Sequence, residues 1–288
     1  MMIDTACSRA IQEAYDDRYA IPAFNFWNIE SVQAFVDAAE KEHSPVILSA
    51  HEKLWDVVSL ESYSALVRAA AKRATVPVFL HLDHGSTVKV VATCIRAGFD
   101  SVMIDGASLS LSRNVETTRK VVEMAHAASV LVEGAIGKTQ GRPMKRMEPF
   151  KTDPKSVQYF VPRTAVDLLA VSVGNVSGTP DGKSRLDMDL LERIAQASPV
   201  PLVLHGGTGV PDKEARRAIS LGVCKINIGT IMFRTYLREV VKVLRTERFE
   251  GAPSSSAMDL LFAKRRTKSS LEQVARRKMK TFGSSGKA

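Results

Sequence analysis

The stretch PVFLHLDHG (residues 77–85) begins as an apolar run and ends in polar residues. A short apolar run opened by proline and closed by glycine is typical of a strand buried on both faces of a parallel sheet. Asp83 and His84 then stand at the C-terminal end of that strand, where parallel α/β enzymes carry their active sites. The stretch therefore predicts a parallel sheet with a polar site at its edge.

Seven further runs rich in β-branched residues recur along the chain, and amphipathic stretches such as IESVQAFVDAAEKEH separate them. Eight such units close a barrel, so the predicted fold class is α/β, a (β/α)8 TIM barrel with a C-terminal helical extension. We expect residues 1–250 to form the catalytic barrel and residues 251–288 a basic helical extension of the same domain. The predicted strands are residues 21–26, 45–50, 77–83, 101–106, 130–137, 167–174, 201–207 and 224–229.

The distribution of charge along the chain argues against nucleic acid as a partner of the main body. Residues 264–288 contain nine Lys and Arg against one acid, Glu272, and so hold nearly all of the net charge of +9. The rest of the chain is close to neutral, which argues against a nucleic-acid-binding face. No apolar run approaches the roughly 20 residues of a membrane span, and the first residues lack the order of a signal peptide. With three widely spaced cysteines, the sequence predicts a cytoplasmic protein without membrane contacts.

Polar residues lie at or just after the ends of seven predicted strands. Two of them, His84 and His205, are imidazoles that can converge on one metal ion. Asp83 can then carry a proton or orient an imidazole, and His81, one strand repeat earlier, is expected to pack structurally. Taken singly, such residues are more often caps or satisfied core groups. The set comprises Asn25, Asp83 with His84, Asp105, Glu133, Asn175, His205 and Asn227.

Two glycine-containing turns indicate a phosphate. LHGGTG (204–209) follows a strand and leads toward a helix, so the backbone N–H groups of its last three residues can cradle an anion. KINIGT (225–230) adds polar groups after the eighth strand. In barrels, phosphate usually binds at the loops after strands seven and eight. The alternative is that these glycines only make tight turns.

The motifs HLDHG, SVMIDG, VEGAIG, SVGNVSG, LVLHGG and KINIGT, in this order, resemble the class II, metal-dependent aldolases of ketose bisphosphates, which include fructose- and tagatose-bisphosphate aldolases. The resemblance spans the chain. It implies a Zn²⁺ ion or another divalent cation that stabilises the enediolate of dihydroxyacetone phosphate, and a homo-oligomer. The implied roles are Asp83 as catalytic acid/base, His84 and His205 as metal ligands, Asn25, Gly178, Gly206, Thr208, Asn227 and Thr230 as substrate or phosphate contacts, and Asp105 and Glu133 as a second cation site or support.

Two departures from the family pattern bear on the metal. Ser177 stands where the family has its third zinc-ligand histidine, and Ala135 replaces a glutamate that approaches the metal. Fewer ligands and less negative charge weaken zinc binding. A water or His51 could complete the site. Alternatively, the cation is dispensed with and basic residues of the long loop 138–156 take its role: Lys138, Arg142, Lys145 and Arg146, with Lys138 also a candidate for Schiff-base chemistry.

Three functions follow from these observations. The first is an aldehyde-lyase that cleaves or forms a carbon–carbon bond in a phosphorylated ketose or keto acid. The second is a non-catalytic sugar-phosphate-binding paralogue, or a partner subunit of an active aldolase, because Ser177 replaces a ligand. The third is nucleic-acid binding by the basic tail, which lacks aromatic interleaving or a recognised motif.

Overall fold

A computed structural model describes residues 3–137, 151–176, 178, 184–245 and 257–288. Within these ranges, eight parallel strands pair in chain order and β8 pairs with β1, so the predicted (β/α)8 barrel is confirmed. The sixth and seventh strands end three residues earlier than predicted. The strands are β1 (Ile21–Asn25), β2 (Val46–His51), β3 (Val78–Gly85), β4 (Ser101–Ile104), β5 (Leu131–Ile136), β6 (Leu168–Val171), β7 (Leu202–Leu204) and β8 (Val223–Ile228).

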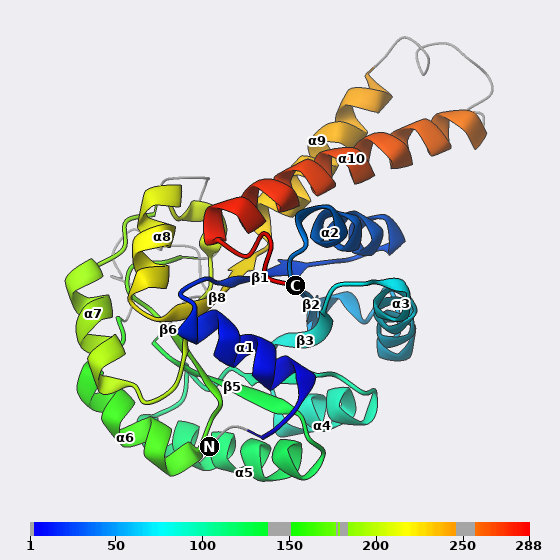
Figure 1. The fold of residues 1–288 in the computed structure, drawn as a ribbon. Coiled ribbons are helices and arrows are strands. Elements are labelled where there is room, and N and C mark those ends of the chain that lie inside the picture. Colours follow the sequence, from blue (N-terminus) through cyan, green and yellow to red (C-terminus); the bar gives the residue numbers. More distant parts are fainter. Residues whose placement is uncertain (1–2, 138–150, 177, 179–183, 246–256) are drawn as a thin grey trace.

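Helices surround the strands, and α1 crosses one end of the ring (Figure 1). Most begin at a Ser, Thr, Asn or Asp whose side chain accepts a hydrogen bond from the first turn, as Thr5, Asn28 and Ser110 do. The helices are α1 (Ala6–Asp16), α2 (Ile29–Glu42), α3 (Leu60–Arg73), α4 (Val88–Arg96), α5 (Leu111–Ala127), α6 (Pro154–Thr164), α7 (Met188–Ala197), α8 (Asp212–Ser220), α9 (Thr230–Leu244) and α10 (Ala257–Phe282), with 3-10 turns η1 (Glu52–Leu54) and η2 (Gly207–Gly209). None of the described helices is long and apolar enough to cross a membrane.

The strands separate two apolar cores because alternate residues point to opposite faces. On β1, Phe24 packs outward with Phe35 of α2, while Ile21 and Ala23 face the barrel interior. The next inward position on this strand is Asn25. The interior therefore changes from apolar to polar toward the C-terminal ends of the strands, which positions the site.

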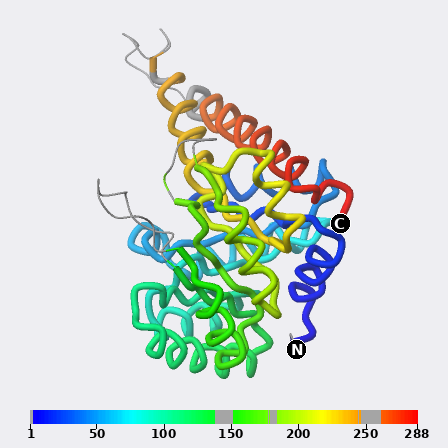
Figure 2. The backbone as a smooth tube through the Cα atoms, turned by 90° about the vertical axis from the view of Figure 1, so that its left-hand side faces the viewer, coloured from blue at the N-terminus to red at the C-terminus, as the bar shows by residue number. Residues whose placement is uncertain are grey.

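The final helix lies across the outside of the barrel. Figure 2 shows α10 beside α9, and in Figure 1 both helices extend beyond the ring of strands. Basic residues of α10 pair with acids of the body: Lys268 with Asp37 at 2.5 Å, Arg276 with Glu42 at 2.7 Å and Lys278 with Asp212 at 3.1 Å. Part of the basic charge seen in the sequence therefore fastens α10 to α2 and α8.

Candidate active site

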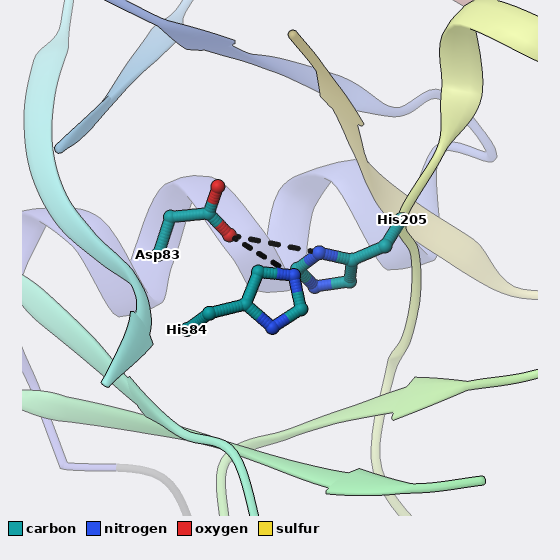
Figure 3. Close-up of side chains that lie close together, drawn as sticks. All are labelled: Asp83, His84 and His205. Carbon is teal, nitrogen blue, oxygen red and sulfur yellow. Dashed lines mark ion pairs between the residues drawn. The ribbon is translucent and has the colours of Figure 1, made fainter. Parts of the chain in front are cut away.

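Asp83 and His84 are consecutive in β3, yet both side chains lie in one cluster (Figure 3). Successive residues of a regular strand point to opposite faces. Here the pairing of β3 with β4 shifts between Leu82 and Gly85, and His84 has a left-handed φ of 56°. Such a bulge changes the direction of a side chain. The bulge therefore lets neighbouring residues contribute to the same site.

His205 completes the cluster from the end of β7. Ligand atoms of Asp83, His84 and His205 all lie within 4.8 Å of one another, and all three residues are buried. Oδ1 of Asp83 is 3.7 Å from Nε2 of His84 and 3.6 Å from Nδ1 of His205. The backbone carbonyl of His205 accepts a hydrogen bond from Nδ2 of Asn175 over 3.1 Å, which ties this residue to the end of β6.

Each imidazole has a carboxylate behind it. Nδ1 of His84 is 2.7 Å from Oδ2 of Asp105, and Nε2 of His205 is 2.7 Å from Oε1 of Glu133. The opposite nitrogens of both rings face Asp83. Metal-bound histidines usually donate their other N–H to such a carboxylate, so the donor chemistry fits a divalent cation. The two acids, predicted as a second cation site or support, each lie within hydrogen-bonding distance of one of these imidazoles.

Two asparagines fix the carboxylate of Asp83. Nδ2 of Asn25 donates to Oδ2 over 2.7 Å, and Nδ2 of Asn227 donates to Oδ1 over 3.1 Å. Burial opposes ionisation of Asp83, but His84, His205 and the Asn25 hydrogen bond hold its pKa well below its ordinary value. Asp83 is therefore a carboxylate at neutral pH. For His84, burial opposes protonation, yet Asp83 and Asp105 raise its pKa above the ordinary value.

The residues predicted to bind phosphate gather where β7 and β8 end. Gly206, with a φ of 65°, precedes η2, and Oγ1 of Thr208 accepts from the backbone N–H of Ile231 over 3.1 Å. This bond places η2 against the start of α9, whose first residue is Thr230. A Cβ on Gly207 would stand 2.4 Å from Cγ2 of Ile226, so only glycine fits this turn.

Several predicted residues lie elsewhere or outside the described ranges. Gly178 has a left-handed φ of 85°, while Ser177, Lys138, Arg142, Lys145 and Arg146 are not among the described residues. The ring of His51 has its centroid 6.3 Å from that of His84, and its Nδ1 accepts from the backbone N–H of Lys53 over 3.3 Å. His51 is therefore near the cluster without belonging to it. Ala135 is buried in the apolar interior of the barrel.

Sequence reasoning missed Lys225 and gave His81 only a structural role. Nζ of Lys225 lies 2.6 Å from Oε2 of Glu133 and 3.1 Å from Nε2 of His81, and Nδ1 of His81 is 2.8 Å from Oγ of Ser101. These groups form the layer directly below Asp83 and Asn227, two residues earlier on β3 and β8. The signal was a lysine inside an apolar strand, because lysine is rarely buried without a partner.

A closed barrel with a buried cluster of Asp83, His84 and His205 at the C-terminal ends of its strands has the geometry of an enzyme active site, and comparisons with known proteins identify the family. The class-II fructose-bisphosphate aldolase family matches residues 5–287. A probable fructose-bisphosphate aldolase of Bacillus subtilis (strain 168) is 36% identical over 283 residues, which cover 96% of this chain and 97% of the relative. A 6-phospho-5-dehydro-2-deoxy-D-gluconate aldolase of Shouchella clausii is 39% identical over 224 residues, 76% of each chain.

A solved structure agrees as well. The YdjI aldolase from Escherichia coli K12 superposes with a TM-score of 0.85 at 32% sequence identity, and the alignment covers 100% of both chains. The chain belongs to the class-II fructose-bisphosphate aldolase family, and it is an aldolase-type lyase. The resemblance inferred from the motifs is confirmed, and the non-catalytic alternative is not favoured.

Proposed function

We propose that this chain reversibly cleaves a carbon–carbon bond in a phosphorylated ketose or keto acid, with Asp83 as acid/base and a divalent cation at His84 and His205. The convergence of these three buried side chains within 4.8 Å is the main support. The names of the relatives include a fructose-bisphosphate aldolase and an aldolase of a phosphorylated sugar acid. Both names fit the two substrate classes of the proposal.

The cation would be held by Nε2 of His84 and Nδ1 of His205, the ring nitrogens that face Asp83. Zn²⁺ is the preferred candidate because imidazole is a common zinc ligand. When bound, the cation supplies a Lewis acid that polarises the substrate ketone. Asp105 and Glu133 keep each ring oriented by accepting a hydrogen bond from its other nitrogen.

Asp83 would move the proton. In the cleavage direction, its carboxylate takes the proton of the substrate hydroxyl, the adjacent carbon–carbon bond breaks, and the carbon that bears the oxygen becomes an aldehyde. The electron pair of the broken bond passes to the ketone fragment, which then takes up a proton. Asn25 and Asn227 hold the carboxylate in place for this transfer, so its orientation is set before substrate binds.

The phosphate would bind at Gly206, Thr208 and Thr230, with Gly178 from the loop after β6, and Asn227 would contact another part of the substrate. Oδ1 of Asn227 supports a ligand contact, because it is buried and has no hydrogen-bond partner among the described residues. A substrate hydroxyl can donate to this oxygen while Nδ2 of the same residue remains on Asp83.

The experiment is a retro-aldol assay of the purified chain on sugar bisphosphates and phosphorylated keto acids, with and without Zn²⁺. Asp83→Asn should lower kcat about 100- to 10,000-fold, since general acid–base catalysis contributes on that scale. The matched control is Asp189→Asn, an exposed acid on α7, which should leave kcat unchanged. Absence of retro-aldol activity on every substrate, with and without metal, would exclude the proposal.

Location, assembly and domain organisation are also proposed. We infer a cytoplasmic protein, which the three free and buried cysteines support. We further propose that residues 1–250 form the barrel, that residues 251–288 extend the same domain, and that the chain forms a homo-oligomer by family resemblance. Sedimentation equilibrium of the purified chain tests the last proposal, which a monomer at every concentration would contradict.

A further inference from the structure

Lys225 is a buried cation that the proposed reaction does not use. It lies on β8, its exposed fraction is 1%, and its ammonium group contacts Glu133 and His81 inside the barrel. A buried ammonium is stable only with compensating partners. Because an ammonium group only donates, Nε2 of His81 accepts, and the proton of that ring resides on Nδ1, beside Ser101.

Glu133 connects Lys225 to the proposed cation site. Its Oε2 is 2.6 Å from Nζ of Lys225, and its Oε1 is 2.7 Å from Nε2 of His205. Glu133 has an exposed fraction of 0%. With its proton on Nε2 and shared with Glu133, His205 presents the lone pair of Nδ1 toward Asp83, 3.6 Å away. The hydrogen bond between Nε2 of His205 and Glu133 therefore leaves Nδ1 as the nitrogen of His205 that can bind a metal.

The second imidazole is supported differently. Asp105 contacts His84 in the same manner, but its side chain is 23% exposed, and no Lys or Arg forms an ion pair with it among the described residues. Solvent can stabilise that carboxylate. Glu133 has no access to solvent, so its charge requires a counter-ion within the barrel. Lys225 supplies it, which explains why only one of the two carboxylates has a lysine.

We infer that Lys225 is a positioning residue of the cation site, which acts through Glu133 to hold His205 in the tautomer and orientation that bind a divalent cation. The inference rests on the proposed function in one respect, the cation at His84 and His205. It predicts that cation affinity depends on a residue that does not touch the cation.

The experiment measures Co²⁺ binding to the metal-free full-length chain, by calorimetry and by the visible absorption of the bound ion. Lys225→Met should weaken Co²⁺ binding about 10- to 100-fold, the range found when a residue that supports a metal ligand is removed. It should also change the absorption spectrum, because His205 is displaced. The matched control is Lys278→Met, which removes the second buried lysine of the described residues, a residue of α10 that pairs with Asp212 and has no contact with Glu133 or His205 among the described residues. The control should leave affinity and spectrum unchanged.

Two double variants keep the test decisive if Lys225→Met fails to fold. Lys225→Met with Glu133→Gln removes both charges but keeps an oxygen that accepts from Nε2 of His205. Lys225→Met with Glu133→Leu removes the acceptor as well. We expect the first to bind Co²⁺ within about tenfold of the native chain, and the second to bind about 10- to 100-fold more weakly than the first.

The outcomes separate this inference from the proposed function. If the native chain binds Co²⁺ and Lys225→Met binds it equally well, with the same spectrum, only the inference on Lys225 is overturned. Equal affinity of the two double variants overturns it too. If the native chain binds no Co²⁺, both the cation site and this inference are overturned.

Discussion

The side-chain amide of Asn25 donates a hydrogen bond of 2.7 Å to Oδ2 of Asp83. The two residues are 58 positions apart, and the barrel brings β1 and β3 together to form this contact. Asn227 of β8 holds the other oxygen of the same carboxylate. Residues of two other strands thus hold the carboxylate of the proposed acid/base. Its position depends on the space available to the side chain of each asparagine.

Gly229 provides the room for Asn25. A Cβ at position 229 would lie 2.5 Å from Oδ1 of Asn25, although the backbone there is not left-handed. Gly229→Ala should therefore displace the amide from Asp83 and lower kcat/KM about 10- to 100-fold, the value of a hydrogen bond to a charged group. Asn25→Ala should cause a similar loss.

The double variant of Gly229→Ala and Asn25→Ala distinguishes this effect from a general disturbance. Both changes remove the same hydrogen bond, the one from Asn25 to Asp83. The double variant should therefore have a kcat/KM no lower than that of Asn25→Ala. Steady-state kinetics of the three variants measure this. Additive losses would show that the alanine at 229 acts on something other than Asn25.

Metal removal should stop the reaction. After dialysis against a chelator, we expect no turnover, and added Zn²⁺ or Co²⁺ should restore it. The same ions should raise the midpoint of thermal unfolding, because a ligand that binds only the folded chain stabilises it. His205→Ala should lose both responses. Full activity of the chelated protein would contradict a role for the cation.

His81 should make stability depend on pH. Burial, followed by the charge of Lys225, lowers the pKa of His81 from 6.5 to about 3. Between these values the unfolded chain binds a proton here that the folded chain does not, so the free energy of unfolding falls as the pH falls through this window. His81→Gln should make that slope shallower by up to about 1.4 kcal/mol per pH unit. Urea unfolding at several pH values measures it, and parallel curves would contradict the prediction.

Glu42 should fasten the last helix in a pH-dependent manner. Burial opposes its ionisation, but Arg276, Ser285 and Lys280 hold its pKa below the ordinary value of 4.5. Such a carboxylate stabilises the fold above pH 4.5, and the stabilisation is lost as the pH falls through the lowered pKa. Glu42→Gln should cost about 1–3 kcal/mol at pH 7.

Chemical unfolding of Glu42→Gln and the native chain at pH 7 and at pH 3 checks this, and the difference should narrow at the lower pH. Glu116→Gln is the control, since this glutamate is exposed on α5 and pairs only with neighbouring basic side chains of the same helix. It should change stability little. A difference that stays constant with pH would contradict the role assigned to Glu42.

The sequence predicted the barrel because its strands are apolar and β-branched. A parallel strand buried on both faces requires such a composition. It also predicted that Asp83, His84 and His205 meet, since the C-terminal ends of parallel strands lie on one face. It could not predict the left-handed backbone at His84, because that bulge arises from the pairing of β3 with β4.

Pairings between distant side chains were equally beyond the sequence. Lys225 and Glu133 meet because both side chains point into the barrel. Whether a side chain points inward depends on the register of its strand, and a shift of one residue turns it to the opposite face. Asn227 was predicted to contact phosphate, and in the structure its amide holds Asp83. An amide can serve either partner, so residue type alone did not decide between them.

The packing of α10 has a consequence for the order of folding. The backbone N–H of Ala20 donates to the carbonyl of Phe282, and that of Gly286 donates to the carbonyl of Glu42. The start of β1 and the end of α2 are therefore bound by residues that are synthesised after all eight strands. Contacts this distant in sequence form slowly, because a long loop must close first. During synthesis, the surface of β1 and α2 that contacts α10 stays exposed until the strands of the barrel have been made and α10 can pack against it.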